Sequence, residues 1–174
     1  VVSTLCAMTG LKTLLIEIPI RQNQDEVNRA WEHMEHLKKR FSNVEAISVN
    51  LSPAFEELYK TFDVKDEDFP AEKLAFANTR SRLRMLTLYY YGQINSLLVC
   101  GTGNKVEDFG VGFFTKYGDG GVDVSPIADL YKTEVYALAK SLDLVESIQN
   151  AIPADGLWDE VRTDEQQIGA TYPE

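Results

Sequence analysis

The sequence has 174 residues, of which 44% are hydrophobic and 25% are charged, and this composition excludes an intrinsically disordered chain. Its 17 Lys and Arg against 27 Asp and Glu give a net charge of −10, which excludes bulk electrostatic attraction to nucleic acid or anionic lipid. A polyanionic ligand must therefore be bound by a few placed cations or by a metal ion. No apolar run approaches the ~20 residues that span a bilayer, so we expect neither a nucleic-acid nor a membrane partner.

The two cysteines indicate the cellular compartment, and the length of the chain limits the number of domains. Cys6 and Cys100 each lie in an apolar stretch, and two small buried thiols are typical of a protein in a reducing compartment such as the cytoplasm. One hydrophobic core suffices at this length, because a chain of about 150 residues buries about 70% of its unfolded surface. We therefore expect residues 1–174 to form a single cytoplasmic domain, which opens with a helix that ends at Gly10.

Hydrophobic periodicity predicts alternating strands and helices. In chain order we expect a strand at 11–18, a helix at 27–41, a strand at 44–51, a helix at 55–62, a loop at 63–70, a helix at 71–95 and a strand at 96–101. This alternation is typical of an α/β fold with a Rossmann-like parallel sheet and helices on both faces. Ligands of such sheets bind beyond the carboxyl ends of the strands, so we expect chemistry directly after Cys100. His33 and His36 lie near the polar side of the helix 27–41 and are predicted to be surface residues.

The helix at 71–95 carries a charge on a face that its spacing predicts to be apolar. Asn78, Arg82 and Met85 share this face, whereas Arg80 and Arg84 lie almost opposite. An unpaired guanidinium there would cost several kcal/mol. Arg82 is therefore expected to meet an anionic ligand, or else to form a buried salt bridge or to extend its stem towards water.

Small and polar residues follow the strand predicted at 96–101. Gly101-Thr102-Gly103 lets the backbone approach a ligand closely, and Thr102 adds a hydroxyl group. Asn104 is expected to cap a short helix that has Glu107 at its third position. Glu107 then either completes the cap or holds a hard cation such as Mg²⁺, and spacing alone leaves both interpretations open.

Two further segments combine turn residues with chemistry-bearing side chains. The stretch Gly112–Asp123 mixes four glycines with paired aromatic rings, Lys116, Asp119 and Asp123. Glycines suit a plain turn, but this mixture indicates a loop shaped around a small molecule. Downstream, Asp129 is expected to cap a helix, which places Lys132 in the first turn as a phosphate ligand or a solvated lysine.

Taken together, these segments resemble the ammonia-dependent NAD synthetases of the ATP-pyrophosphatase superfamily. The matching segments are 78–85, 101–105, 112–123 and 126–132, followed by 153–158, 163–165, 168–169 and Tyr172. The resemblance implies an adenine nucleotide alpha-hydrolase-like fold. It also implies a ligase that joins ammonia to deamido-NAD through an adenylated intermediate and releases AMP and pyrophosphate. ATP is implied as co-substrate, Mg²⁺ as cofactor and a homodimer as the assembly.

The resemblance also implies a role for eight residues. Those expected at ATP are Thr102, Lys132 and Ala154, where Ala154 replaces the Thr or Ser of many relatives. Those expected at deamido-NAD are Arg82, Lys116 and Asp123. Glu107 is expected to bind Mg²⁺, and Asp119 and Lys132 are the expected catalytic residues.

Two family segments are missing from the sequence. A Ser-Gly-Gly-x-Asp-Ser phosphate loop would lie immediately before Val1, and a His-Lys pair would lie beyond Glu174. We therefore expect the domain to lack its N-terminal phosphate loop and its C-terminal end, and residues 151–174 to be a mobile segment over the active site. Two alternatives remain: another amide-forming ATP pyrophosphatase, and a non-catalytic nucleotide-binding fragment.

Overall fold

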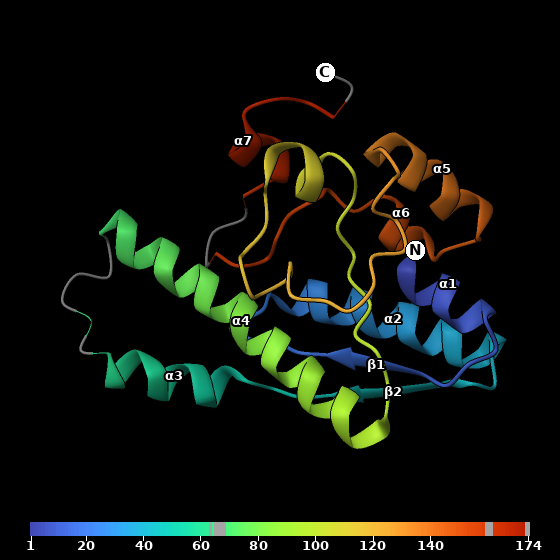
Figure 1. Ribbon diagram of the computed structural model, residues 1–174, viewed down its shortest axis with the longest axis horizontal. Helices are drawn as coiled ribbons and strands as arrows, with labels where there is room; N and C mark the ends of the chain where they lie inside the picture. Colours follow the sequence, from blue (N-terminus) through green and yellow to red (C-terminus); the bar gives the residue numbers. More distant parts are fainter. Residues whose placement is uncertain (63, 65–68, 159–161, 173–174) are drawn as a thin grey trace.

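A two-stranded parallel sheet organises the fold in the computed structural model, which describes residues 1–62, 64, 69–158 and 162–172. Strand β1 (Thr13–Glu17) pairs with β2 (Val44–Ser48) from the Thr13–Val44 pair to the Glu17–Ser48 pair. The helix α2 (Gln24–Arg40) connects the two strands (Figure 1). The α/β class with a parallel sheet is confirmed.

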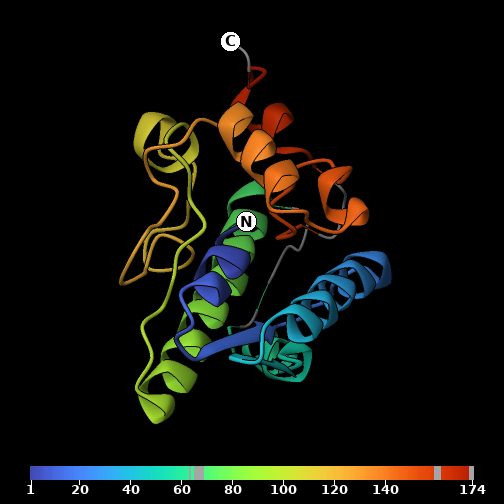
Figure 2. The ribbon, with the colours of Figure 1, turned by 90° about the vertical axis from the view of Figure 1, so that its right-hand side faces the viewer.

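Helices make up most of the remaining regular structure. Besides α2, they are α1 (Val2–Met8), α3 (Ser52–Thr61), α4 (Pro70–Asn95), the π-helical turn η1 (Glu107–Val111), α5 (Lys132–Ser141), α6 (Glu146–Gln149) and α7 (Asp164–Ile168). Helices α2 and α4 lie on opposite sides of β1 (Figure 2). None of the helices in the described ranges is both long and apolar enough to span a membrane. The loop predicted at 63–70 lies mostly outside the described residues.

The strand predicted at 96–101 is wrong. Within the described chain this segment forms only an isolated parallel bridge between Cys100 and Val124, flanked by a hydrogen bond from Gly101 N to Val124 O of 2.8 Å. The physical reason is that an apolar run becomes a strand only where a neighbouring strand completes its hydrogen bonds. The bridge nevertheless positions the Gly101 loop, residues 101–105, because this loop begins where the bridge ends.

The core lies between the sheet and its flanking helices. Leu37 of α2 is fully buried and packs with Ala7 of α1 and Val44 of β2. The two thiols also meet between distant segments: Cys6 Sγ lies 3.5 Å from Cys100 Sγ, and both cysteines are free and half-buried. Their sulfur atoms therefore link α1 to the segment that precedes the Gly101 loop.

The buried face of α4 is not the predicted one. Arg80 is 4% exposed, whereas Arg82 is exposed to solvent. The Arg80 guanidinium lies 5.0 Å from the Phe55 ring centroid and donates to Leu157 O, while Arg84 donates to Ile18 O at 3.2 Å. The prediction fails because apolar side chains occur around the whole helix, so their spacing does not select a face. Carbonyl groups and an aromatic ring make the buried guanidinium groups tolerable.

His33 departs from its predicted place on the surface. It is half-buried on α2, with Nε2 2.8 Å from Ser3 Oγ, and Nδ1 has no partner among the described residues. Burial lowers the pKa of His33 to about 4. As pH falls from about 6.5 towards 4, the unfolded chain therefore binds a proton that the folded chain does not, and stability is lost.

Replacing His33 with Gln should remove this acid sensitivity, because glutamine can still pair with Ser3 but does not titrate. The free energy of unfolding of the unaltered protein should fall by at most about 3 kcal/mol between pH 6.5 and 4. Urea unfolding at several pH values measures the slope of the free energy of unfolding against pH. His36→Gln is the matched control and should keep it, and an equal slope in the His33 variant would contradict the assignment.

Candidate active site

Asn104 bonds to the start of the short helix as predicted and fixes Glu107 in place, but Val106 is the N-cap residue of η1 and Glu107 is its first residue rather than its third. Asn104 is 2% exposed, and its Oδ1 accepts hydrogen bonds from Val106 N at 3.0 Å and from Glu107 N at 3.1 Å. Its Nδ2 donates to Glu107 Oε2 at 2.5 Å. The asparagine thus holds both the backbone and the carboxylate of Glu107 at the start of η1, and one carboxylate oxygen remains for other partners.

Lys132 supplies a positive charge to that remaining oxygen. Its Nζ lies 2.7 Å from Glu107 Oε1, and the two side chains are only 16% and 13% exposed. Lys132 is the first residue of α5. Asp129 is not the N-cap as predicted, because Ile127 O accepts from Leu130 N in a separate turn and Tyr131 caps the helix instead. A buried ion pair of this kind is tolerated only when its remaining polar atoms are also bonded.

Residues of the C-terminal segment complete the surroundings of Glu107. The Tyr172 hydroxyl donates to Glu107 Oε1 and lies 3.2 Å from Asp164 Oδ2. Lys132 Nζ lies 4.9 Å from the centroid of the Tyr172 ring. Burial and the neighbouring carboxylates raise the pKa of Tyr172, and burial raises the pKa of Asp164. The phenol therefore stays protonated and acts as a hydrogen-bond donor.

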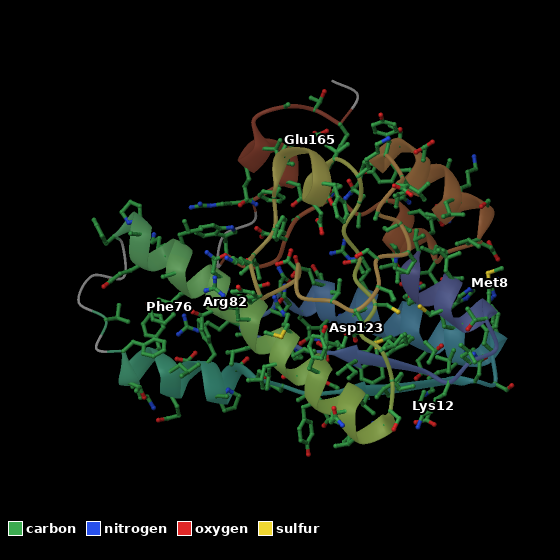
Figure 3. The ribbon with its side chains drawn as sticks, viewed as in Figure 1. Met8, Lys12, Phe76, Arg82, Asp123 and Glu165 are labelled. Atoms are coloured by element: carbon green, nitrogen blue, oxygen red, sulfur yellow. The ribbon has the colours of Figure 1, made fainter. Side chains whose placement is uncertain are left out.

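The loop between η1 and α5 is bound to α4 by side chains. Ser81 Oγ donates to Asp119 Oδ1 at 2.7 Å and accepts from Asp119 N at 2.9 Å. Tyr89 OH donates to Asp123 Oδ1 at 3.1 Å, and the other Asp123 oxygen accepts from Val99 N. Figure 3 shows Asp123 in this loop beside α4. Both aspartates, predicted as ligand residues, thus also have structural partners.

Arg82 and Lys116 meet at the edge of the same loop. Arg82 Nε donates to Lys116 O at 3.1 Å, and Arg82 projects from α4 (Figure 3). Lys116 Nζ lies 5.0 Å from the Tyr117 ring centroid. Both side chains are exposed. The prediction that Arg82 lies on an apolar face of the helix is therefore wrong, and the contact between Arg82 and Lys116 brings together two of the residues that the resemblance assigns to deamido-NAD.

Gly118 is required by the close approach of this loop to α4. A Cβ atom at this position would overlap Ser81 Oγ and lie 2.9 Å from Thr115 Cβ. Thr115 is buried, and its hydroxyl donates to Asn78 Oδ1 at 2.6 Å. The glycine therefore allows the loop to pack directly against the helix, as expected of a shaped loop rather than a plain turn.

A separate cavity of about 360 Å³ holds the predicted ATP residue Ala154. It lies where β1 leads into α2. Its lining residues are Arg21, Gln22, Asn23, Gln24, Glu26, Ala154, Asp155, Gly156, Trp158 and Arg162. The Arg162 guanidinium lies 4.2 Å from the Trp158 ring centroid. This volume is within the range of small-molecule pockets, about 300–1,000 Å³.

The structure thus places the predicted residues in three groups. Glu107 pairs with Lys132; Lys116, Asp119 and Asp123 lie on the loop against α4 with Arg82 of α4 beside them; and Ala154 lines the cavity. Thr102 is exposed and does not line the cavity. Sequence reasoning gave no role to Asp164 and used Tyr172 only as part of the tail match. No spacing could relate Tyr172 to Glu107, because the two are 65 residues apart.

Comparison with known proteins identifies the fold and the family. The chain has the adenine nucleotide alpha-hydrolase fold, since its structural neighbours include NMN synthetase from Francisella tularensis, with a TM-score of 0.86, 33% identity and coverage of 99% of this chain and 68% of that one. NH3-dependent NAD synthetase from Campylobacter jejuni, in complex with nitrate, gives a TM-score of 0.69 and 30% identity over 85% of this chain and 60% of that one.

The sequence comparison agrees. The family model for NAD synthase matches residues 1–174. The NH(3)-dependent NAD(+) synthetase of Carboxydothermus hydrogenoformans is 43% identical over 161 residues, which is 92% of this chain. The chain belongs to the NAD synthase family, and it spans 63% of the length of that curated relative.

Replacing Gly118 with Ala should disturb the packing of the loop against α4. The added methyl group would force Ser81 and the loop apart, and overpacking of this kind costs about 1–3 kcal/mol. Urea unfolding measures the change in the free energy of unfolding. In the control Gly110→Ala the new Cβ meets only Lys105 O, at 3.3 Å, so the control should lose less. Equal stability of the two variants would rule out the close approach.

Proposed function

We propose that the protein forms NAD⁺ by ATP-dependent amidation of deamido-NAD with ammonia. The observation that carries the proposal is the largely buried Glu107–Lys132 pair, at 2.7 Å, in a chain matched over its whole length by the NAD synthase family. An acidic protein that binds two phosphorylated substrates needs positive charge at defined points. Lys132, Lys116 and Arg82 provide it. We include a cytoplasmic location in the proposal, because the two free thiols suit a reducing compartment.

The reaction has two steps in this proposal. An oxygen of the nicotinate carboxylate forms a bond to the α-phosphorus of ATP as the bond to the β-phosphate breaks, which releases pyrophosphate. The ammonia nitrogen then attacks the acyl carbon, and AMP leaves. Positioning and charge neutralisation are the main requirements of nucleotidyl transfer. Lys132 meets the phosphates at the N-terminus of α5, where the helix dipole also favours an anion. Asp119 orients ammonia.

The remaining predicted residues bind the substrates. Arg82, Lys116 and Asp123 hold deamido-NAD, and the contact of the loop that carries Lys116 and Asp123 with Arg82 and Tyr89 of α4 supports this role. For ATP, Ala154 lies in a cavity of sufficient size for part of a nucleotide. Thr102, which is the exposed residue directly after Gly101, contacts ATP.

Glu107 fits the Mg²⁺ that the family implies. Its carboxylate is a hard oxygen donor, is largely buried and already faces one cation, Lys132 Nζ. Across the described part of the chain, no group of three or more His, Cys, Asp or Glu side chains is arranged to hold a metal ion. Substrate phosphates and water would then supply most ligands, as is usual for this ion. When bound, Mg²⁺ neutralises charge on the phosphates.

We also propose that the protein is a homodimer. Leu86, Tyr90 and Ile94 lie four residues apart on α4 and are 62%, 59% and 60% exposed. Residues at this spacing form one stripe on a helix, and contiguous exposed apolar surface is typical of a protein–protein interface. A second copy of the chain would cover this stripe.

A second candidate is the synthesis of NMN, in which the amidated acid is nicotinate mononucleotide. The higher TM-score with the Francisella NMN synthetase, 0.86 against 0.69 for the Campylobacter NAD synthetase, favours it. The two functions share the adenylation chemistry and differ in whether an adenylate group extends from the nicotinate mononucleotide. Binding of the acid substrate by Lys116 is therefore relevant to both candidate functions.

Incubation of the full-length gene product with ATP, Mg²⁺, ammonia and each acid tests the proposal. We expect NAD⁺, AMP and pyrophosphate to form from deamido-NAD, faster than NMN forms from nicotinate mononucleotide. Chromatography of the products measures both. Preference for the mononucleotide would select the second candidate, and no pyrophosphate release with either acid would exclude both.

Lys116→Ala should raise the KM for deamido-NAD about tenfold or more and change the KM for ATP far less. Loss of one charge-assisted contact costs about 1.5–3 kcal/mol, which is equivalent to about ten- to a hundredfold. Lys105→Ala is the matched control, because Lys105 is also exposed and also lies over an aromatic ring, that of Tyr131, at 4.5 Å. Initial-rate kinetics distinguish the two, and equal effects on both substrates would reassign Lys116.

A further inference from the structure

A single hydroxyl group joins two carboxylates that are far apart in the sequence. The Tyr172 hydroxyl donates to Glu107 Oε1 and lies 3.2 Å from Asp164 Oδ2. Since both acceptors contact the same oxygen atom, the carboxylates face each other across it. Two facing carboxylates are usually held by a positive charge, because like charges at this separation repel.

Asp164 is more deeply buried than its hydrogen bonds explain. It is 7% exposed, and its Oδ1 has no hydrogen-bond partner among the described residues. Its backbone is fixed, because Asp164 N donates to Pro153 O at 3.0 Å and Thr163 caps the helix that Asp164 begins. Burial of a carboxylate oxygen without a partner costs free energy. A ligand that completes its coordination would remove this cost.

The surroundings of the two carboxylates already accommodate a cation. Lys132 Nζ lies 2.7 Å from Glu107 Oε1 and 4.9 Å from the centroid of the Tyr172 ring. Asn104 holds the other Glu107 oxygen, so Oε1 is the oxygen that faces Tyr172 and Lys132. The space beside Oε1 therefore contains a positive group and a hydroxyl hydrogen, and both are donors that a metal ion can replace.

We propose that Asp164 and Glu107 together bind a hard divalent cation such as Mg²⁺ or Mn²⁺, and that the Tyr172 hydroxyl bridges them when no cation is bound. The inference rests on the proposed role of Glu107 and adds a second carboxylate from α7. Cation binding moves the Tyr172 hydroxyl out of the space between the carboxylates. The segment that carries Asp164 and Tyr172 thus responds to the metal.

Mn²⁺ binding to the full-length protein without nucleotide, followed by electron paramagnetic resonance, tests the proposal. Asp164→Asn should weaken Mn²⁺ binding about tenfold or more, and Glu107→Gln similarly. Asp164→Asn should keep its thermal midpoint, because it removes a poorly paired buried charge. Tyr172→Phe keeps the ring, removes the competing hydroxyl and should bind Mn²⁺ at least as tightly as the unaltered protein. Asp129→Asn, at an exposed aspartate, is the matched control and should change nothing.

The outcomes separate this inference from the proposed function. Unchanged Mn²⁺ binding in Asp164→Asn with weakened binding in Glu107→Gln would overturn the role of Asp164 and leave that of Glu107 standing. Unchanged binding in both variants would overturn the two-carboxylate site and the metal role of Glu107 together. A tenfold loss in Tyr172→Phe would also overturn the proposal, because the hydroxyl would then support the cation rather than compete with it.

Discussion

The contact between Glu107 and Lys132 is the constraint on which the site depends. It joins the start of η1 to the start of α5, two elements that the sequence separates by a long loop. An ion pair with so little exposure needs further partners, and Asn104 and Tyr172 provide them at the two carboxylate oxygens. The charge on Lys132 is therefore oriented before any ligand arrives. Pre-orientation of this kind lets a strongly acidic protein bind polyanions with few cations.

Side-chain hydrogen bonds, rather than strand pairing, position the loop that carries the other predicted ligands. Ser81 and Tyr89 of α4 hold the two aspartates, and Gly118 lets the loop approach the helix. The same arrangement leaves the ends of Arg82 and Lys116 in solvent, available to a phosphorylated ligand. The carboxylates of Asp119 and Asp123 thus fix the loop, while the positive charges of Lys116 on the loop and of Arg82 on α4 remain exposed.

Local patterns predicted the elements better than the contacts between them. The helix expected at 71–95 is α4 (Pro70–Asn95), and the strand expected at 44–51 contains β2 (Val44–Ser48), because periodicity reports which side chains a single element buries. The strand at 96–101 failed because pairing depends on a neighbour. The face of α4 was also mispredicted, since Arg80 is buried by groups from α3 and residue 157. The motifs located Glu107 and Lys132, but only the fold could bring in Tyr172 and Asp164.

Three hydrogen bonds join residues 153–158 and 162–172 to the preceding elements: Leu157 O accepts from Arg80, Gly156 O accepts from Gln22, and Glu107 accepts from Tyr172. When one of these bonds opens, both of its partners bond to water instead. Exchange of these bonds alone should therefore carry only a small heat-capacity change. Hydrogen bonds of this kind can break and re-form with nearly the same ease over a wide range of temperature.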